Sequence, residues 1–142
     1  MPKQLPVRKS VVPALLLAAV AGVLVTPQVF ARMSFNTIDT VATIADHGNH
    51  IIVTGPIQCD QVQWVDMRVT ITQRTTGAVA EGKIHFLGTP GLQEWTVDAA
   101  VKGKIDFEEG PATVVALGVS KVQGQADDAH QWLVEVLLVD EH

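Results

Sequence analysis

The sequence predicts an all-β domain, a single immunoglobulin-like antiparallel β-sandwich of about seven strands. Apolar and polar residues alternate with a period of two from residue 38 onward, which is typical of strands with one buried face. The alternating segments are short, and Gly, Pro, Asn or Asp stands at the joins between them, as tight turns require. A small β-barrel is the alternative, because the same pattern serves two packed sheets or one closed sheet.

Three segments alternate most clearly. Residues 63–73 place Val65, Met67, Val69 and Ile71 on one face, and Asp66, Arg68, Thr70 and Thr72 on the other. Residues 94–101 carry Trp95 and Val97 in phase, which predicts that both lie in the core.

The third clear segment, residues 130–139, is apolar on both faces. Trp132, Val134, Val136 and Leu138 share one face, while Leu133 and Leu137 share the other face with Glu135. We therefore expect a strand near the centre of a sheet that is buried on both sides.

Weaker patterns predict four further strands, at residues 38–44, 50–57, 78–86 and 113–119. Turn residues precede three of them, at 46–49, 75–77 and 108–111.

The first 31 residues have the pattern of a cleavable export signal. Lys3, Arg8 and Lys9 precede a run from Val11 to Val25 that holds no charged residue, and Val29-Phe30-Ala31 gives a small-x-Ala cleavage pattern. An uncleaved membrane anchor is the alternative, but it needs about 20 apolar residues. We expect cleavage after Ala31, a domain over residues 32–142, and a secreted, periplasmic or cell-envelope location.

The mature chain is acidic. Three of the ten Lys and Arg lie in the leader, so seven remain against 15 Asp and Glu, a formal charge of −8. Such a surface repels nucleic-acid phosphates and anionic lipids. We therefore expect no nucleic acid and no membrane as partners after cleavage, and an unknown protein or envelope component instead.

Cys59 is the chain's one cysteine, so an internal disulfide is excluded. A buried thiol that packs as a small apolar group is one interpretation, and an intermolecular disulfide is the other.

Metal binding is the best of the weak chemical signals. Asp46, His47 and His50 lie within one loop, and His130 follows two aspartates. Neutral imidazole binds zinc or copper well, so these residues are candidate ligands for a divalent metal. The alternative is that they are ordinary polar turn residues. No pattern predicts another cofactor or a catalytic residue.

A candidate binding surface lies on the polar face of residues 63–73. Trp64 is out of phase with the apolar residues that follow it, so it points to the same side as Asp66, Arg68 and Thr70. An exposed Trp beside charged residues is a candidate anchor for a partner. Burial of Trp64 beneath a loop is the alternative.

Several stretches resemble a group of small exported bacterial β-sandwich proteins of unknown function: VTGPIQC (53–59), MRVTITQR (67–74), GAVAEG (77–82), QEW (93–95) and DAHQWL (128–133). The likeness spans roughly residues 50–139. It implies a second Cys just before the Trp95 strand, yet residues 86–91 read FLGTPG. The resemblance supplies no activity.

These observations predict an exported, non-catalytic binding or structural protein. A metal-binding protein that uses His47 and His50 is the first alternative. A small enzyme whose site is assembled only by the fold is the second, because a β-fold by itself implies no function.

Overall fold

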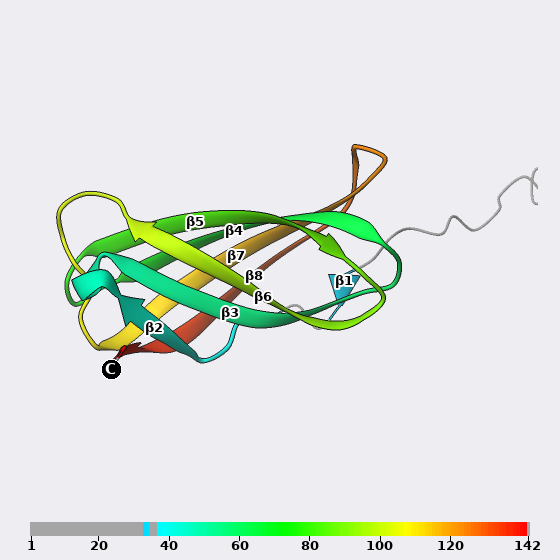
Figure 1. Cartoon of the computed structure of the whole chain (residues 1–142). Coiled ribbons are helices and arrows are strands. Elements are labelled where there is room, and N and C mark those ends of the chain that lie inside the picture. Colours follow the sequence, from blue (N-terminus) through cyan, green and yellow to red (C-terminus); the bar gives the residue numbers. More distant parts are fainter. Residues whose placement is uncertain (1–32, 35–36, 142) are drawn as a thin grey trace, which may run out of the picture.

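The computed structural model describes residues 33–34 and 37–141, and in these ranges the chain is built of strands and one turn of 3-10 helix (Figure 1). In chain order the elements are β1 (Met33–Ser34), β2 (Val41–Ala45), η1 (Asp46–Gly48), β3 (His50–Cys59), β4 (Gln63–Gln73), β5 (Ala78–Gly88), β6 (Gly91–Val101), β7 (Gly110–Val122) and β8 (Gln125–Asp140). In this part of the chain, no helix has the length and apolarity that a membrane crossing requires. The export signal predicted for residues 1–31 lies outside the described residues.

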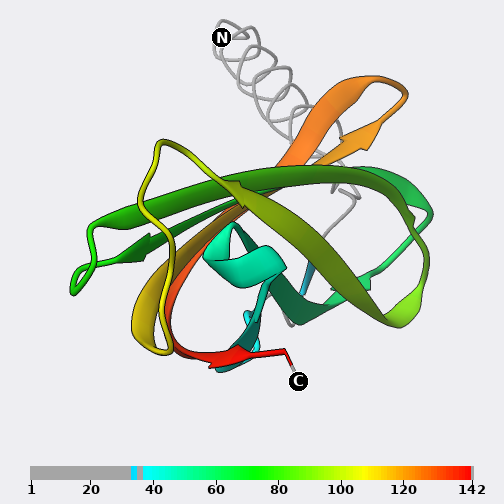
Figure 2. The same cartoon turned by 60° about the vertical axis from the view of Figure 1, so that its left-hand side comes forward.

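The strands form one sheet that closes on itself. Its order is β1-β3-β2-β8-β7-β4-β5-β6, and a further pairing of β3 with β6 joins the two sides, so that β2 to β8 make a closed barrel (Figure 2). Neighbouring strands are antiparallel except for β2 and β8, which run parallel. The all-β prediction is confirmed, and the strands take the barrel alternative.

The immunoglobulin-like sandwich is not confirmed, because hydrogen bonds join what would be its two sheets. Strand β3 pairs with β6 over nine residue pairs, from His50↔Ala100 to Gln58↔Leu92. On the other side, β2 pairs with β8 from Val41↔Leu137 to Ile44↔Asp140. Apolar and polar residues alternate along each strand in a sandwich and in a barrel alike, so only these long-range pairings distinguish the two architectures.

The barrel is most weakly closed between β5 and β6. Only Ala80↔Val101 and Glu81↔Ala100 pair there, and beyond them the two strands diverge (Figure 1). Gly82 lies at the point of divergence, where its backbone closely approaches β6. An ideal Cβ at Gly82 would lie 2.7 Å from the carbonyl oxygen of Asp98 and 2.7 Å from Cγ1 of Val97.

We expect Gly82→Ala to lower the free energy of unfolding by about 1–3 kcal/mol, because the added methyl group would push β6 away from β5. Gly118→Ala is the matched control, since its nearest neighbours, Met67 Cε and a ring atom of Trp132, would lie 3.4 Å from the new Cβ. Urea unfolding of both variants measures the effect. Equal losses would contradict the close approach at Gly82.

The barrel interior holds the apolar faces predicted for the central strands. Val65, Val69 and Ile71 of β4 are fully buried, Met67 is 1% exposed, and Trp95 on β6 is 2% exposed. Trp132 and Val134 of β8 are partly buried and pack against this core. These core predictions are confirmed.

The prediction that β8 is buried on both faces is wrong. Leu133 and Leu137 are 63% and 50% exposed, while Val136 and Leu138 on the opposite face are buried. Each strand of a closed barrel has one face toward the interior and one toward solvent. The apolar residues on the second face of β8 are therefore part of the outer surface.

The predicted strands each correspond to an observed one, and β4 has the predicted bounds. No sequence pattern predicts β1, whose two residues pair with Cys59 and Gln58 at the end of β3. Met33 is nonetheless 3% exposed. A pair of residues is too short to show any period.

Candidate functional site

A groove crosses the outer face of β4 between its neighbours β5 and β7. Its volume is about 560 Å³, and its lining consists of Asp66, Met67, Arg68, Lys83, Ile84, His85, Leu117 and Val119. The volume falls in the range of about 300–1,000 Å³ that is typical of small-molecule pockets. Alternation places the groove's polar residues outward, because Met67 beside them faces the interior.

Asp66 is the centre of a hydrogen-bonded cluster at one end of the groove. Its Oδ1 lies 2.5 Å from Nδ1 of His85, and its Oδ2 lies 2.7 Å from Nζ of Lys121. The hydrogen bond from Lys121 lowers the pKa of Asp66, and the hydrogen bond with His85 lowers it further. The indole ring of Trp64 stacks on the imidazole of His85, with the ring centroids 4.6 Å apart and the planes inclined by 7°.

The lowered pKa of Asp66 has a consequence for stability. The contribution of this carboxylate is present above its ordinary pKa of 3.8 and is lost as the pH falls through the lower, folded-state pKa. At pH 7 we expect Asp66→Asn to reduce the free energy of unfolding by less than about 1 kcal/mol, since solvent screens this pair. Urea unfolding at pH 7 and below pH 3.8 should show the difference shrinking toward zero, whereas a constant difference would contradict the assignment.

Two cations lie side by side at the end of the groove away from Asp66. Arg68 on β4 and Lys83 on β5 are direct cross-strand partners, and like charges in this arrangement are mutually destabilising. Arg68 Nε is 3.9 Å from Oε1 of Glu81, a long contact between exposed side chains. Among the described residues, Lys83 has no ion pair.

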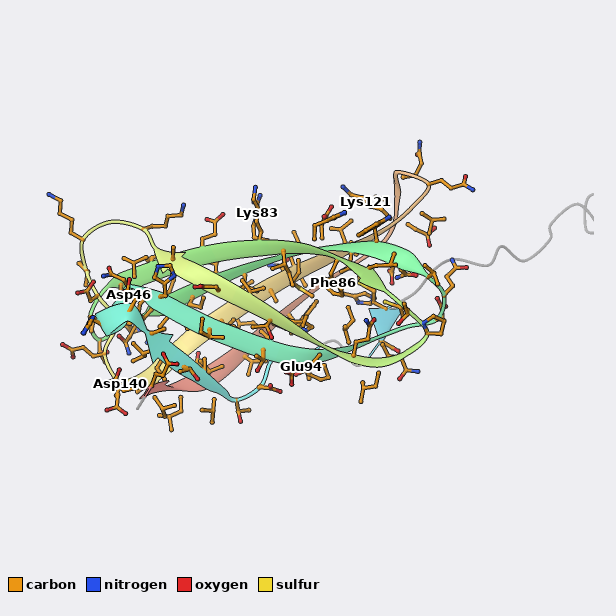
Figure 3. The ribbon with its side chains drawn as sticks, in the orientation of Figure 1. Asp46, Lys83, Phe86, Glu94, Lys121 and Asp140 are labelled. Atoms are coloured by element: carbon orange, nitrogen blue, oxygen red, sulfur yellow. The ribbon has the colours of Figure 1, made fainter. Side chains whose placement is uncertain are left out.

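The groove gathers an unusual share of the chain's positive charge. Residues 37–141 contain six Lys and Arg, and Arg68, Lys83 and Lys121 lie on this one face. Figure 3 shows Lys83 and Lys121 projecting from the same side of the barrel, with Glu94 and Asp140 on the other side. An otherwise acidic protein thus has a locally cationic groove.

The binding surface predicted from the sequence falls on this face. Trp64 is 46% exposed, so it points outward as its phase predicts and is not buried beneath a loop. Asp66 and Arg68 line the groove, and Trp64 borders it through His85. Thr70 also faces outward but does not line the groove.

Sequence reasoning missed the groove's other two walls. Lys83 and His85 come from β5, and Leu117 and Val119 come from β7. Their alternation marks them as outward-facing, but only the strand register brings them beside β4: His85 and Val119 both pair with Asp66.

The candidate metal ligands lie at two separate places. Nδ1 of His50 is 2.7 Å from Oδ1 of Asp98, and Nε2 of His50 is 3.9 Å from Oδ2 of Asp46. His130 is hydrogen-bonded to Asp128, at 3.0 Å. His130 lies ten residues before Asp140 on β8, which is about 30 Å along an extended strand. Because Asp140 pairs with Ile44, close to Asp46, His130 is far from the other candidate ligands.

A second, acidic groove lies at the η1 end of the barrel. Its volume is about 820 Å³, and its lining includes Asp46, His47, Glu108, Glu109, Asp140 and Glu141. His47 has positive φ, 57°, and so does Asp46, at 52°. The groove brings Asp46 and His47 together, but its lining does not include His50 or His130.

In the ranges that the structure describes, no group of three or more His, Cys, Asp or Glu is arranged to hold a metal ion. A bound zinc ion needs three or four converging ligands. Metal binding by Asp46, His47, His50 and His130 stays a prediction, which elemental analysis of the purified protein tests.

Cys59 is a free, buried thiol at the end of β3. Burial raises the pKa of this thiol, and the neighbouring charge of Asp60 raises it further. The protonated form therefore dominates at neutral pH, which makes Cys59 a poor nucleophile. Its Sγ faces Gly88 of β5, where an ideal Cβ would lie only 2.5 Å away.

Comparison with known proteins adds no further assignment to this geometry. No known protein family matches the chain. No curated protein sequence matches it either.

Proposed function

We propose that this chain is an exported, non-catalytic binding protein of the cell envelope or extracellular space. Its binding surface is the outer face of β4 with the flanking parts of β5 and β7. The observation that carries the proposal is the groove of about 560 Å³, in which Arg68 and Lys83 lie side by side.

Three features of this face support a role in binding. The stacked rings of Trp64 and His85 give a rigid, partly exposed aromatic surface, of the kind that anchors partners. Arg68 and Lys83 offer hydrogen-bond donors that the described residues leave largely unused. Because β4 is hydrogen-bonded on both sides, the backbone beneath these side chains is held in place.

The protonated, buried state of Cys59 supports the non-catalytic part of the proposal. Ser120 is also buried, and its hydroxyl lies 3.4 Å from the carbonyl oxygen of Asp128. A nucleophile needs both access to substrate and an activating base. Neither side chain has the access.

Site-specific photo-crosslinking tests the binding surface. A photoreactive residue replaces Arg68 in the full chain, expressed in its native host, and a second variant carries it at Lys104 in the exposed loop after β6. The two changes remove the same charge, so they are matched. We expect a discrete adduct at position 68 that excess unlabelled protein competes away. Equal adducts at both positions, or none at position 68, would contradict the proposal.

Export is tested separately, by sequencing the N-terminus of the protein recovered outside the cytoplasm. The leader pattern in residues 1–31 supports cleavage after Ala31, so the recovered chain should begin at Arg32. A chain that still begins at Met1 would overturn this part.

A further inference from the structure

We infer that the groove on β4, β5 and β7 accepts a small amphipathic anion, a molecule in which a carboxylate, phosphate or sulfate group is joined to an apolar body. This inference rests on the proposed binding function and names the ligand class of the same site. Three properties of the groove lead to it: positive charge that is only weakly compensated, an apolar wall, and an acid whose charge is already offset.

The positive charge points to an anionic group. Arg68 and Lys83 are opposed across the strands, and the contact of Arg68 with Glu81 is 3.9 Å long. An anion bound between them would replace a repulsion with two charge-assisted hydrogen bonds. A planar guanidinium beside a flexible ammonium suits the oxygens of a carboxylate, phosphate or sulfate.

Asp66 does not compete for these cations. Lys121 and His85 take its two oxygens, at 2.7 and 2.5 Å. Its negative charge is therefore offset at the Trp64 end of the groove. The groove lining contains no carboxylate besides Asp66. Arg68 and Lys83 therefore remain available to a ligand.

The apolar body has a surface to contact on the opposite side. Leu117 and Val119 of β7 form this wall, and Leu117 is 40% exposed. Leu117 pairs with Gln131 of β8, so that the outward-facing Leu133 is its diagonal neighbour. Leu133 is 63% exposed. Apolar surface thus continues outward from the wall that faces the two cations.

The anionic group (the head) and the apolar body (the tail) of the ligand are tested together by titrating four probes into the protein recovered after export. Isothermal titration calorimetry measures the binding. Octanoate and octyl phosphate carry both parts, octylammonium has the tail with the opposite charge, and inorganic phosphate has the head alone. We expect saturable binding of the first two. The other two should bind at least about tenfold more weakly, since a charged hydrogen bond or a buried tail is worth at least that factor.

Variants locate the binding. Arg68→Gln combined with Lys83→Gln should weaken octanoate binding at least about tenfold. The matched control, Lys102→Gln combined with Lys104→Gln, removes the same charge from the loop after β6 and should change binding less than about twofold. Leu117→Asn should weaken binding of octanoate, while Leu92→Asn, at a residue that is 68% exposed on β6, should not. Thermal unfolding confirms that each variant is folded.

Each remaining outcome decides against the inference. Equal losses from the two double variants would show a general charge effect, and equal binding of octylammonium would show an apolar surface without charge selection. Equal binding of inorganic phosphate would show a simple anion site. If no probe binds while position 68 still gives a competable protein adduct, the ligand class is wrong and the binding surface stands. If both experiments fail, the proposed function fails with the inference.

Discussion

Replacing Trp95 with Ala should lower the free energy of unfolding by about 3–5 kcal/mol. The side chain is 2% exposed, and it is the largest of the fully buried side chains. Its ring lies against Gly55 of β3, where an ideal Cβ would be 2.6 Å from Cζ2. The ring fills the space beside this glycine, which has no side chain of its own. Its removal would therefore leave a cavity that the barrel wall cannot easily close.

Trp64→Ala is the matched control, because the same atoms are removed from a side chain that is 46% exposed. We expect it to cost less than about 1 kcal/mol, mainly from the lost stacking on His85. Urea unfolding followed by far-ultraviolet circular dichroism compares the two variants without relying on tryptophan fluorescence. Similar losses would mean that Trp95 is not the centre of the core.

The second large effect is expected from Gly88→Cys. An ideal Cβ at Gly88 lies 2.5 Å from Sγ of Cys59, too near for a non-bonded methyl group. Across a disulfide this separation is about 3 Å, so a small rotation of the Cys59 side chain would let the two sulfurs bond. Oxidation would close a loop of roughly 30 residues, which stabilises the fold by about 3–4 kcal/mol in the chain-entropy estimate.

Two controls separate the effect of the disulfide bond from the effect of the added side chain. Gly88→Ser adds a side chain of similar size without the bond, and we expect it to be destabilising because Cys59 must move aside. Adding a reductant to Gly88→Cys should abolish its gain and bring its thermal midpoint near that of Gly88→Ser. A variant that keeps two reactive thiols under oxidising conditions, or that is unaffected by reductant, would contradict the close approach of Cys59 and Gly88.

The strands of the domain could be predicted well because each depends on local alternation. Residues 63–73 show this most clearly, since one face is apolar at every position that the barrel buries. The closure could not be predicted, because the pairing of β2 with β8 joins residues 41–44 to 137–140 and leaves no local trace. The same limit explains β8: Leu133 and Leu137 look like core residues until closure places them outside.

Half of the candidate site could be predicted for the same reason. Trp64, Asp66 and Arg68 share one strand, so their common orientation follows from a period of two. Lys83 and His85 belong to the next strand, and their positions opposite Arg68 and Asp66 depend on the register of β4 with β5. The turn between them fixes that register, and the sequence pattern alone leaves it open.

The parallel pairing of β2 with β8 determines when the barrel can close during folding. Its two partners are separated by more than 90 residues, so the ring cannot close during synthesis until β8 has emerged. Bringing such distant segments together carries a large loop-closure entropy, and folds dominated by such contacts acquire their native structure slowly. Until β8 arrives, β2 has only its short antiparallel ladder with β3 to hold it, and the core behind Ala42 and Ile44 stays open to water.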